Sequence, residues 1–131
     1  MTLRSKIVIA LLFPTVATAC VTSRVTPFDP TPVMDHRTPA DAIRFYETEM
    51  PRCQYKEIGH VTAKGNWLTG WGRVVHRVRE RAHDLGGDAV IRVNERTRID
   101  GAVISRGSIS TTESNSLTGT VVRFVNPNCR E

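Results

Sequence analysis

The chain has 131 residues, of which 40% are hydrophobic and 24% are charged, a size and composition that suit one small globular domain. Its formal net charge of +5 falls to +3 if a removable leader takes Arg4 and Lys6 with it. So modest a positive net charge does not argue for a nucleic-acid-binding protein.

Residues 1–19 have the features of an export signal. Arg4 and Lys6 give a positive start, residues 7–13 form a short apolar run, and residues 17–19 read Ala-Thr-Ala. The run is shorter than the roughly 20 helical residues that span a bilayer. Cys20 follows at once, and a cysteine after small residues resembles the bacterial lipobox. This resemblance implies that Cys20 is acylated and becomes the mature N-terminus. The alternatives are ordinary cleavage, which leaves Cys20 as a thiol, and a buried N-terminal strand.

Acylation would hold the chain in the cell envelope through palmitate-like chains, facing the periplasm. Val21, rather than Asp, follows the cysteine. In the sorting scheme of enteric bacteria this implies the outer membrane rather than the inner. Prolines then recur among Thr, Ser and Asp up to residue 40. We therefore expect residues 20–40 to be a lipidated, extended tether and residues 41–131 to be a single domain. The alternative for the proline-rich segment is a loop that wraps the domain.

Two strands are predicted before the middle of the chain. Residues 42–48 alternate in polarity until Pro51 interrupts them. Residues 55–64 also read as a strand, but Ile58 and Val61 lie three positions apart instead of two. Because a glycine inside a strand often marks a β-bulge, Gly59 is expected to bring both side chains onto one face.

An amphipathic helix is predicted from residue 71 to residue 85. Its apolar stripe consists of Trp71, Val74, Val75, Val78, Ala82 and Leu85. Gly86-Gly87 ends the helix, since glycine accepts the left-handed conformation of a helix C-cap. The polar face is interpreted as solvated and paired, Arg77 with Glu80 and Arg81 with Asp84. A basic face for an anionic partner is the alternative.

The remainder of the chain predicts three strands. The first begins at Asp88, and Asp100-Gly101 has the composition of a hairpin turn. The returning strand covers residues 102–110, a Ser/Thr-rich mobile loop extends to residue 118, and the last strand covers residues 119–125 with Val122 and Phe124 toward the helix. The fold class is therefore α+β, one helix on a mostly antiparallel sheet of about five strands, in the order β-β-α-β-β-β.

If Cys20 is acylated, Cys53 and Cys129 are the two remaining cysteines. Export into an oxidising compartment favours a disulfide between them. Free thiols, or bridges to another chain, are the competing possibilities.

The run RVRERAHDLGGDAVIRV, with YKEIGHVTA before it, resembles a signature of small bacterial envelope lipoproteins. This group includes the YbjQ-like family, sometimes called heavy-metal-binding, and the lipoprotein that signals envelope stress to the Rcs phosphorelay. The similarity covers about residues 42–125 and implies a fold and a location rather than a reaction. The Rcs sensor has four cysteines in its domain, whereas this chain has only Cys53 and Cys129 there.

No pattern of catalytic residues or metal ligands is complete. The histidines are His36, His60, His76 and His83. On a helix, the last two would lie about 10 Å apart along the axis, too far for one metal ion. His60 is a weak candidate metal ligand, and Glu57 would join it only if the bulge turned both side chains to one face. Trp71 is expected in the core, whereas Trp67 fits a core position or a ligand surface equally well.

The sequence thus predicts a non-enzymatic envelope lipoprotein with a binding or sensing domain, no cofactor and no nucleic-acid partner. Its expected partners are the membrane, through the lipid anchor, and an envelope protein. The alternative is a small ligand- or metal-binding module of the periplasm, with a cleft where polar groups converge.

Overall fold

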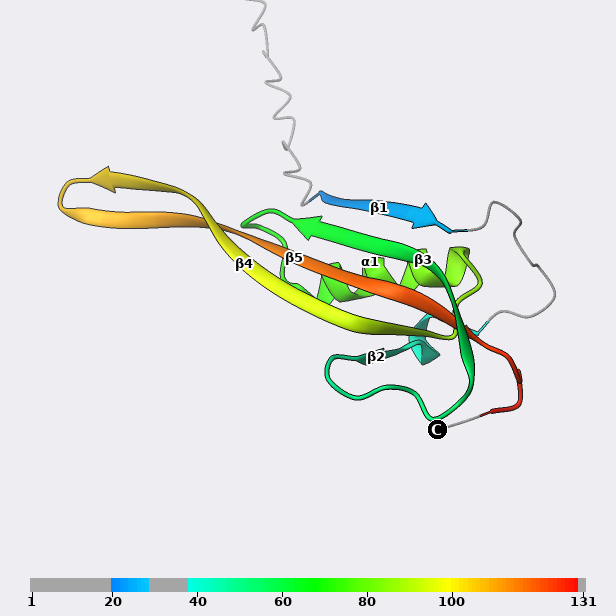
Figure 1. Cartoon of the computed structure of the whole chain (residues 1–131). Helices are drawn as coiled ribbons and strands as arrows, with labels where there is room; N and C mark the ends of the chain where they lie inside the picture. The colour runs from blue at the N-terminus through cyan, green and yellow to red at the C-terminus, as the bar shows by residue number, and fades with distance from the viewer. Residues whose placement is uncertain (1–19, 29–37, 130–131) are drawn as a thin grey trace, which may run out of the picture.

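A computed structural model describes residues 20–28 and 38–129; the predicted export signal and the middle of the predicted tether lie outside these ranges. The elements are β1 (Val21–Pro27), a 3₁₀ helix η1 (Ala40–Ala42), β2 (Arg44–Tyr46), β3 (Tyr55–Gly65), α1 (Trp71–Asp84), β4 (Ala89–Ser105) and β5 (Ser108–Phe124). The strands form one sheet in the order β1-β3-β5-β4-β2, and α1 covers one face of it (Figure 1). Every pair of neighbours is antiparallel except β2 and β4. The predicted α+β class is confirmed.

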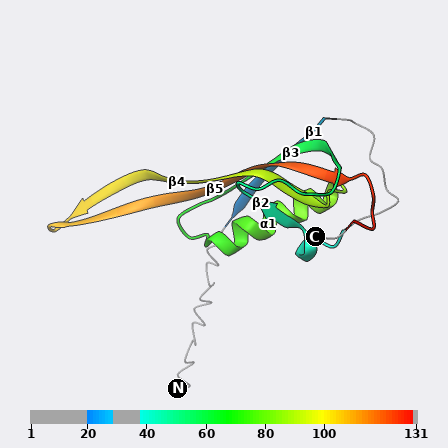
Figure 2. The same cartoon turned by 60° about the horizontal axis from the view of Figure 1, so that its bottom comes forward.

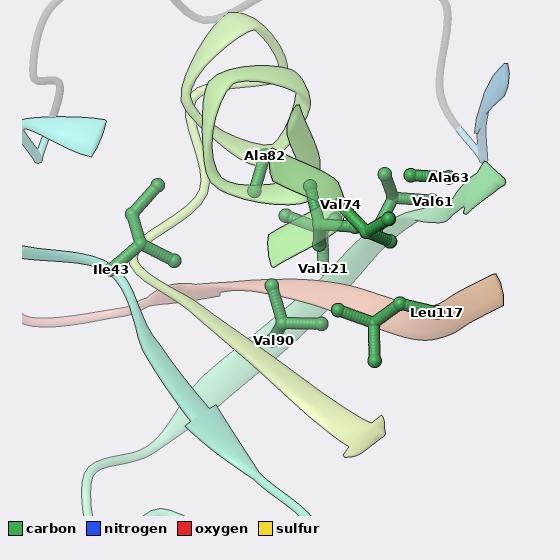
Figure 3. Close-up of a cluster of buried hydrophobic side chains, with 9 residues drawn as sticks. Ile43, Val61, Ala63, Val74, Ala82, Val90, Leu117 and Val121 are labelled. Carbon is green, nitrogen blue, oxygen red and sulfur yellow. The ribbon is translucent and has the colours of Figure 1, made fainter. Parts of the chain in front are cut away.

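The core lies between α1 and the sheet. Val74, Val78 and Ala82 of the helix are fully buried, and the other three residues of the predicted stripe pack around them. Figure 3 shows Val74 and Ala82 of the helix facing side chains from the sheet, among them Val61, Ala63, Val90, Leu117 and Val121. The helical pattern was therefore interpreted correctly, and Trp71 is part of this packing.

A smaller apolar cluster covers the other face of the sheet. It contains Ala89, Ile91 and Val122, with Tyr46, Tyr55 and Phe124 packed against it. The predicted orientation of the last strand is therefore wrong, because Val121 rather than Val122 packs beneath the helix. Both faces of this strand carry apolar residues, so alternation alone could not decide which face meets α1.

The N-terminal segment departs from the predicted order of elements. Residues 21–27, expected as part of a tether, form an edge strand that pairs with β3 from Val21↔Gly65 to Pro27↔Gly59. Val21 and Val25 pack against the core, while Pro27 is the last residue of the strand. An edge strand tolerates proline there because it can spare one N–H group. The observed order is β-β-β-α-β-β, and no helix among the described residues is long and apolar enough to cross a membrane.

The C-terminal strands also differ from the prediction. Asp100-Gly101 is not a turn but a β-bulge inside β4, and the chain reverses at Arg106-Gly107. Both turn residues have positive φ, 48° and 83°, as a tight hairpin turn requires. The Ser/Thr-rich residues expected to form a mobile loop belong to β5. The predicted bulge at Gly59 is confirmed, and it brings Ile58 and Val61 to the same core.

Candidate functional site

Cys20 lies at one end of the sheet, and its position defines that end. It is exposed and directly precedes β1. Val21 pairs with Gly65 of β3, and Gly65 pairs with Asn115 of β5. The start of β1 therefore lies beside the end of β3. Beyond this point β5 continues without β3 as its neighbour. We call this the Cys20 end of the domain.

A two-stranded ribbon projects from the Cys20 end. It consists of residues 98–105 of β4 and residues 108–114 of β5, and we call it the arm. Among the described strands, only these two extend so far, and Figure 1 shows the arm reaching beyond the rest of the sheet. Figure 2 shows that it also extends beyond α1. At about 3.3 Å per residue, the arm is about 20 Å long.

One face of the arm carries three isoleucines. Ile104 lies opposite Ile109, and Ile99 lies opposite Glu113. Directly opposite residues share a face, as do alternate residues of one strand, so all three isoleucines lie on one side of the ribbon. Their exposed fractions are 63%, 75% and 69% for Ile99, Ile104 and Ile109. Leu117 lies on the same face of β5, closer to the helix, where it is part of the core beneath α1.

The connection between β3 and α1 adds two more exposed apolar side chains to the Cys20 end. Asn66 shapes it: its Oδ1 accepts hydrogen bonds from the Thr69 hydroxyl at 2.7 Å and from the Leu68 N–H at 3.2 Å. Thr69 is buried, whereas Trp67 and Leu68 are 64% and 45% exposed. The structure therefore resolves the open question about Trp67, which does not belong to the core.

The polar face of α1 is paired as predicted. Arg77 Nη1 lies 2.8 Å from Glu80 Oε2, and Arg81 Nη1 lies 3.5 Å from Asp84 Oδ2. Glu80 also lies 3.3 Å from His76 Nε2. The two ion-paired arginine–carboxylate pairs line most of a surface depression of about 310 Å³ beside η1. Because both signs of charge are paired within it, the depression does not present an uncompensated basic face.

The aspartate of the predicted signature has a structural role that the sequence did not indicate. Asp88 is buried, and its carboxylate accepts hydrogen bonds from the Phe124 N–H at 2.8 Å and from the Thr38 hydroxyl. Thr38 O in turn lies 2.9 Å from His83 Nδ1. Arg123 Nε donates to Gly86 O at 2.8 Å, which satisfies a carbonyl at the end of α1. These contacts join the start of the 38–129 region, the helix end and the last strand.

We expect Asp88→Ala to lower the free energy of unfolding by about 2 kcal/mol, because it leaves the Phe124 N–H without its acceptor. Urea unfolding followed by circular dichroism measures the change. Asp84→Ala, at an exposed carboxylate at the end of α1, should change stability by less than about 0.5 kcal/mol. Equal effects of the two variants would contradict the structural role of Asp88.

His60 and Glu57 do not form a joint site. His60 is exposed, its Nδ1 lies 3.2 Å from Thr120 Oγ1, and its ring meets Phe28 edge-on with centroids 4.8 Å apart. Glu57 instead forms an ion pair with Arg92 at 2.8 Å. Within residues 20–28 and 38–129, no group of three or more His, Cys, Asp or Glu side chains could hold a metal ion. His36 lies outside the described residues.

The predicted disulfide is present. Cys53 and Cys129 are bonded, with their Cα atoms 6.1 Å apart. The bond lies at the end of the sheet opposite the Cys20 end, since Cys53 comes shortly before Tyr55, and Tyr55 pairs with Phe124. It attaches the C-terminal segment to the loop between β2 and β3.

We expect the arm to contribute little to folding. A variant in which an Asn-Gly turn replaces residues 99–113, joining the opposed residues Arg98 and Ser114, should unfold within about 1 kcal/mol of the wild type. The reason is that most side chains of the arm are exposed. Thermal and urea unfolding would measure this. A loss of several kcal/mol would show that the arm is an integral part of the domain.

Comparison with known proteins gives only a distant structural similarity. No family model matches the chain, and no curated protein matches its sequence. Among solved structures, the chain is similar to one described as the crystal structure of a Francisella virulence factor FvfA in the orthorhombic form. The two share 14% sequence identity with a TM-score of 0.46, over 77% of this chain and 96% of the other.

Proposed function

We propose that this protein is a non-enzymatic lipoprotein of the bacterial cell envelope, anchored through acylated Cys20 and facing the periplasm. The observation that carries the proposal is the Ala-Thr-Ala-Cys sequence after a short apolar run. The exposure of Cys20 supports it, because an acyl chain attached there does not have to pass through the core. The Cys53–Cys129 disulfide agrees with an oxidising compartment. The outer membrane is the expected location.

The domain's role within the envelope is binding or sensing rather than catalysis. The arm supports this interpretation, because a ribbon with a row of exposed isoleucines has little value for folding and much for contact with another surface. A protein of the envelope is one candidate for that contact, and the membrane itself is the other.

The experiment is an intact mass measurement of the protein extracted from membranes. A mass that begins at Cys20 with acyl chains added is expected, and so are two thiols that alkylate only after reduction. Cys20→Ser provides the matched control, and it should leave the protein soluble in the periplasm and without acyl chains. An unacylated wild-type chain in the soluble fraction would disprove the anchoring.

A further inference from the structure

We propose that the Cys20 end of the domain is a lipid-binding surface, on which Trp67, Leu68 and the isoleucine face of the arm lie in the headgroup region of the membrane. This inference rests on the proposed function, since acylated Cys20 supplies the anchor. It goes further, because it assigns a second, non-covalent contact to the folded domain and fixes its orientation.

The first argument is the distance between the anchor and the fold. Cys20 immediately precedes β1, which is paired with β3 from its first residue onward. No residue separates Cys20 from the sheet, so this part of the chain has no tether that could hold the domain away from the bilayer. With its acyl chains in the membrane, Cys20 brings the end of the sheet to the lipid surface, and the arm projects from that same end.

The second argument is the distribution of exposed apolar residues. Eight large hydrophobic side chains of the described residues are exposed, and five of them belong to the arm or to the β3–α1 connection beside Cys20. They are Trp67, Leu68, Ile99, Ile104 and Ile109. Tryptophan favours the membrane interface, where its ring is shielded from water while its N–H stays hydrated.

The third argument is the charge around these residues. The segment from Lys64 to Arg73 contains these two basic residues and no acidic one. The distal part of the arm, residues 101–112, has Arg106 at its turn as its one charged residue, whereas Arg98, Asp100 and Glu113 surround Ile99 at the base of the arm. A charged tip would resist transfer to the interface, whereas Ser and Thr side chains are tolerated there and arginine can extend toward headgroups. Anionic phospholipid is therefore a suitable partner for this end.

These arguments favour lipid over a second copy of the chain or another protein. A protein partner would also cover the isoleucines, but it would not account for their location on an arm that projects from the Cys20 end. By itself, the contact between these side chains and lipid gives a low binding affinity. The anchor raises the local concentration of the domain at the membrane surface, so the contact forms there despite that low affinity.

The test uses the chain from Cys20 onward, with one myristoyl-length chain coupled chemically to Cys20. A single such chain gives marginal binding, with an association constant of about 10⁴ M⁻¹, so a second contact is measurable as tighter partitioning. Vesicles of phosphatidylethanolamine and phosphatidylglycerol are the probe. We expect the wild type to partition about tenfold more tightly than a variant with all five apolar residues replaced by serine. The control variant, Met50→Ser with Val125→Ser, removes exposed apolar residues elsewhere and should partition like the wild type.

A second measurement maps the orientation of the arm. In a Trp67→Phe, Trp71→Phe background, Thr111→Trp and Ser110→Trp place a reporter on opposite faces of one strand. Brominated lipids should quench the first strongly and the second weakly. Equal partitioning of the wild type and the serine variant, or equal quenching at both positions, would overturn the proposal. Concentration-dependent self-association that the serine variant abolishes, without a change in partitioning, would assign the surface to a second copy instead.

The failure of this inference and the failure of the proposed anchoring are distinguishable. Chemical coupling supplies the anchor whether or not the cell acylates Cys20. The mass measurement on the natural protein tests acylation, and the partition experiment tests the surface.

Discussion

Replacing Cys53 and Cys129 together with alanine is expected to lower the free energy of unfolding by about 4 kcal/mol. The two residues are 76 positions apart, so the disulfide closes most of the domain into one loop and greatly restricts the unfolded chain. A small domain has a total stability of about 5–15 kcal/mol, so the loss is a large part of it. Urea unfolding under non-reducing conditions measures the change.

Reductant provides the control for the disulfide. Dithiothreitol should destabilise the wild type by about as much as the double substitution does, and it should leave the substituted protein unchanged. A double variant as stable as the oxidised wild type would contradict the prediction.

Gly87→Ala is expected to lower the free energy of unfolding by about 3 kcal/mol, because the new methyl group has no space. A Cβ at this position would lie 2.2 Å from Val121 Cγ1 and 3.2 Å from the Ala82 carbonyl oxygen. Val121 is fully buried in the core beneath α1, so it cannot move aside without disturbing its neighbours. Thermal and urea unfolding give the magnitude.

Two further variants separate this clash from a general effect of glycine replacement. In the Gly87→Ala background, Val121→Ala removes the opposing methyl groups and should destabilise much less than it does alone. Gly72→Ala, in the first turn of α1 with nothing within 4 Å of the added carbon, should be neutral or stabilise by up to about 1 kcal/mol. Additive losses at positions 87 and 121 would contradict the clash.

The two glycines after α1 illustrate what the sequence could and could not reveal. The prediction assigned Gly86-Gly87 as a unit to the turn. Gly86 has a φ of 75°, as a helix C-cap requires, so that part is confirmed. Gly87 is needed for a different reason, the close approach of Val121 from β5. A contact between residues more than thirty positions apart leaves no local pattern, so the sequence alone could not indicate it.

The same distinction applies to the strands. The stripe on α1 and the bulge at Gly59 were predictable because each depends on residues a few positions apart. β1 was missed because Pro27 and the prolines that follow it are local signals of an extended tether, whereas its partner β3 lies far along the chain. Asp100-Gly101 was mistaken for a turn because its composition suits either a turn or a bulge, and only the register with β5 decides.

The candidate site was predictable in part. Cys20, Cys53 and Cys129 could be singled out from the predicted export signal and the cysteine count. The arm could not, because the turn was placed at Asp100-Gly101 and the residues from 111 onward were read as a Ser/Thr-rich loop. The row of isoleucines becomes visible only when the register places Ile104 opposite Ile109. Asp88 was overlooked because its partners, Thr38 and Phe124, lie far from it in the chain.

The pairing of β1 with β3 also sets an order of events during biogenesis. β4 and β5 meet through a two-residue turn, whereas β1 must close a loop of about 30 residues, between Pro27 and Gly59, before it can pair with β3. Local contacts form faster than distant ones, so we expect the hairpin to fold early and β1 to join the sheet late. If Cys20 is acylated as we propose, the acylating enzyme could therefore meet it before β1 has paired with β3. Completion of the sheet would then hold Cys20 at the end of the folded domain, so the attachment that we propose would become rigid only in the last step of folding.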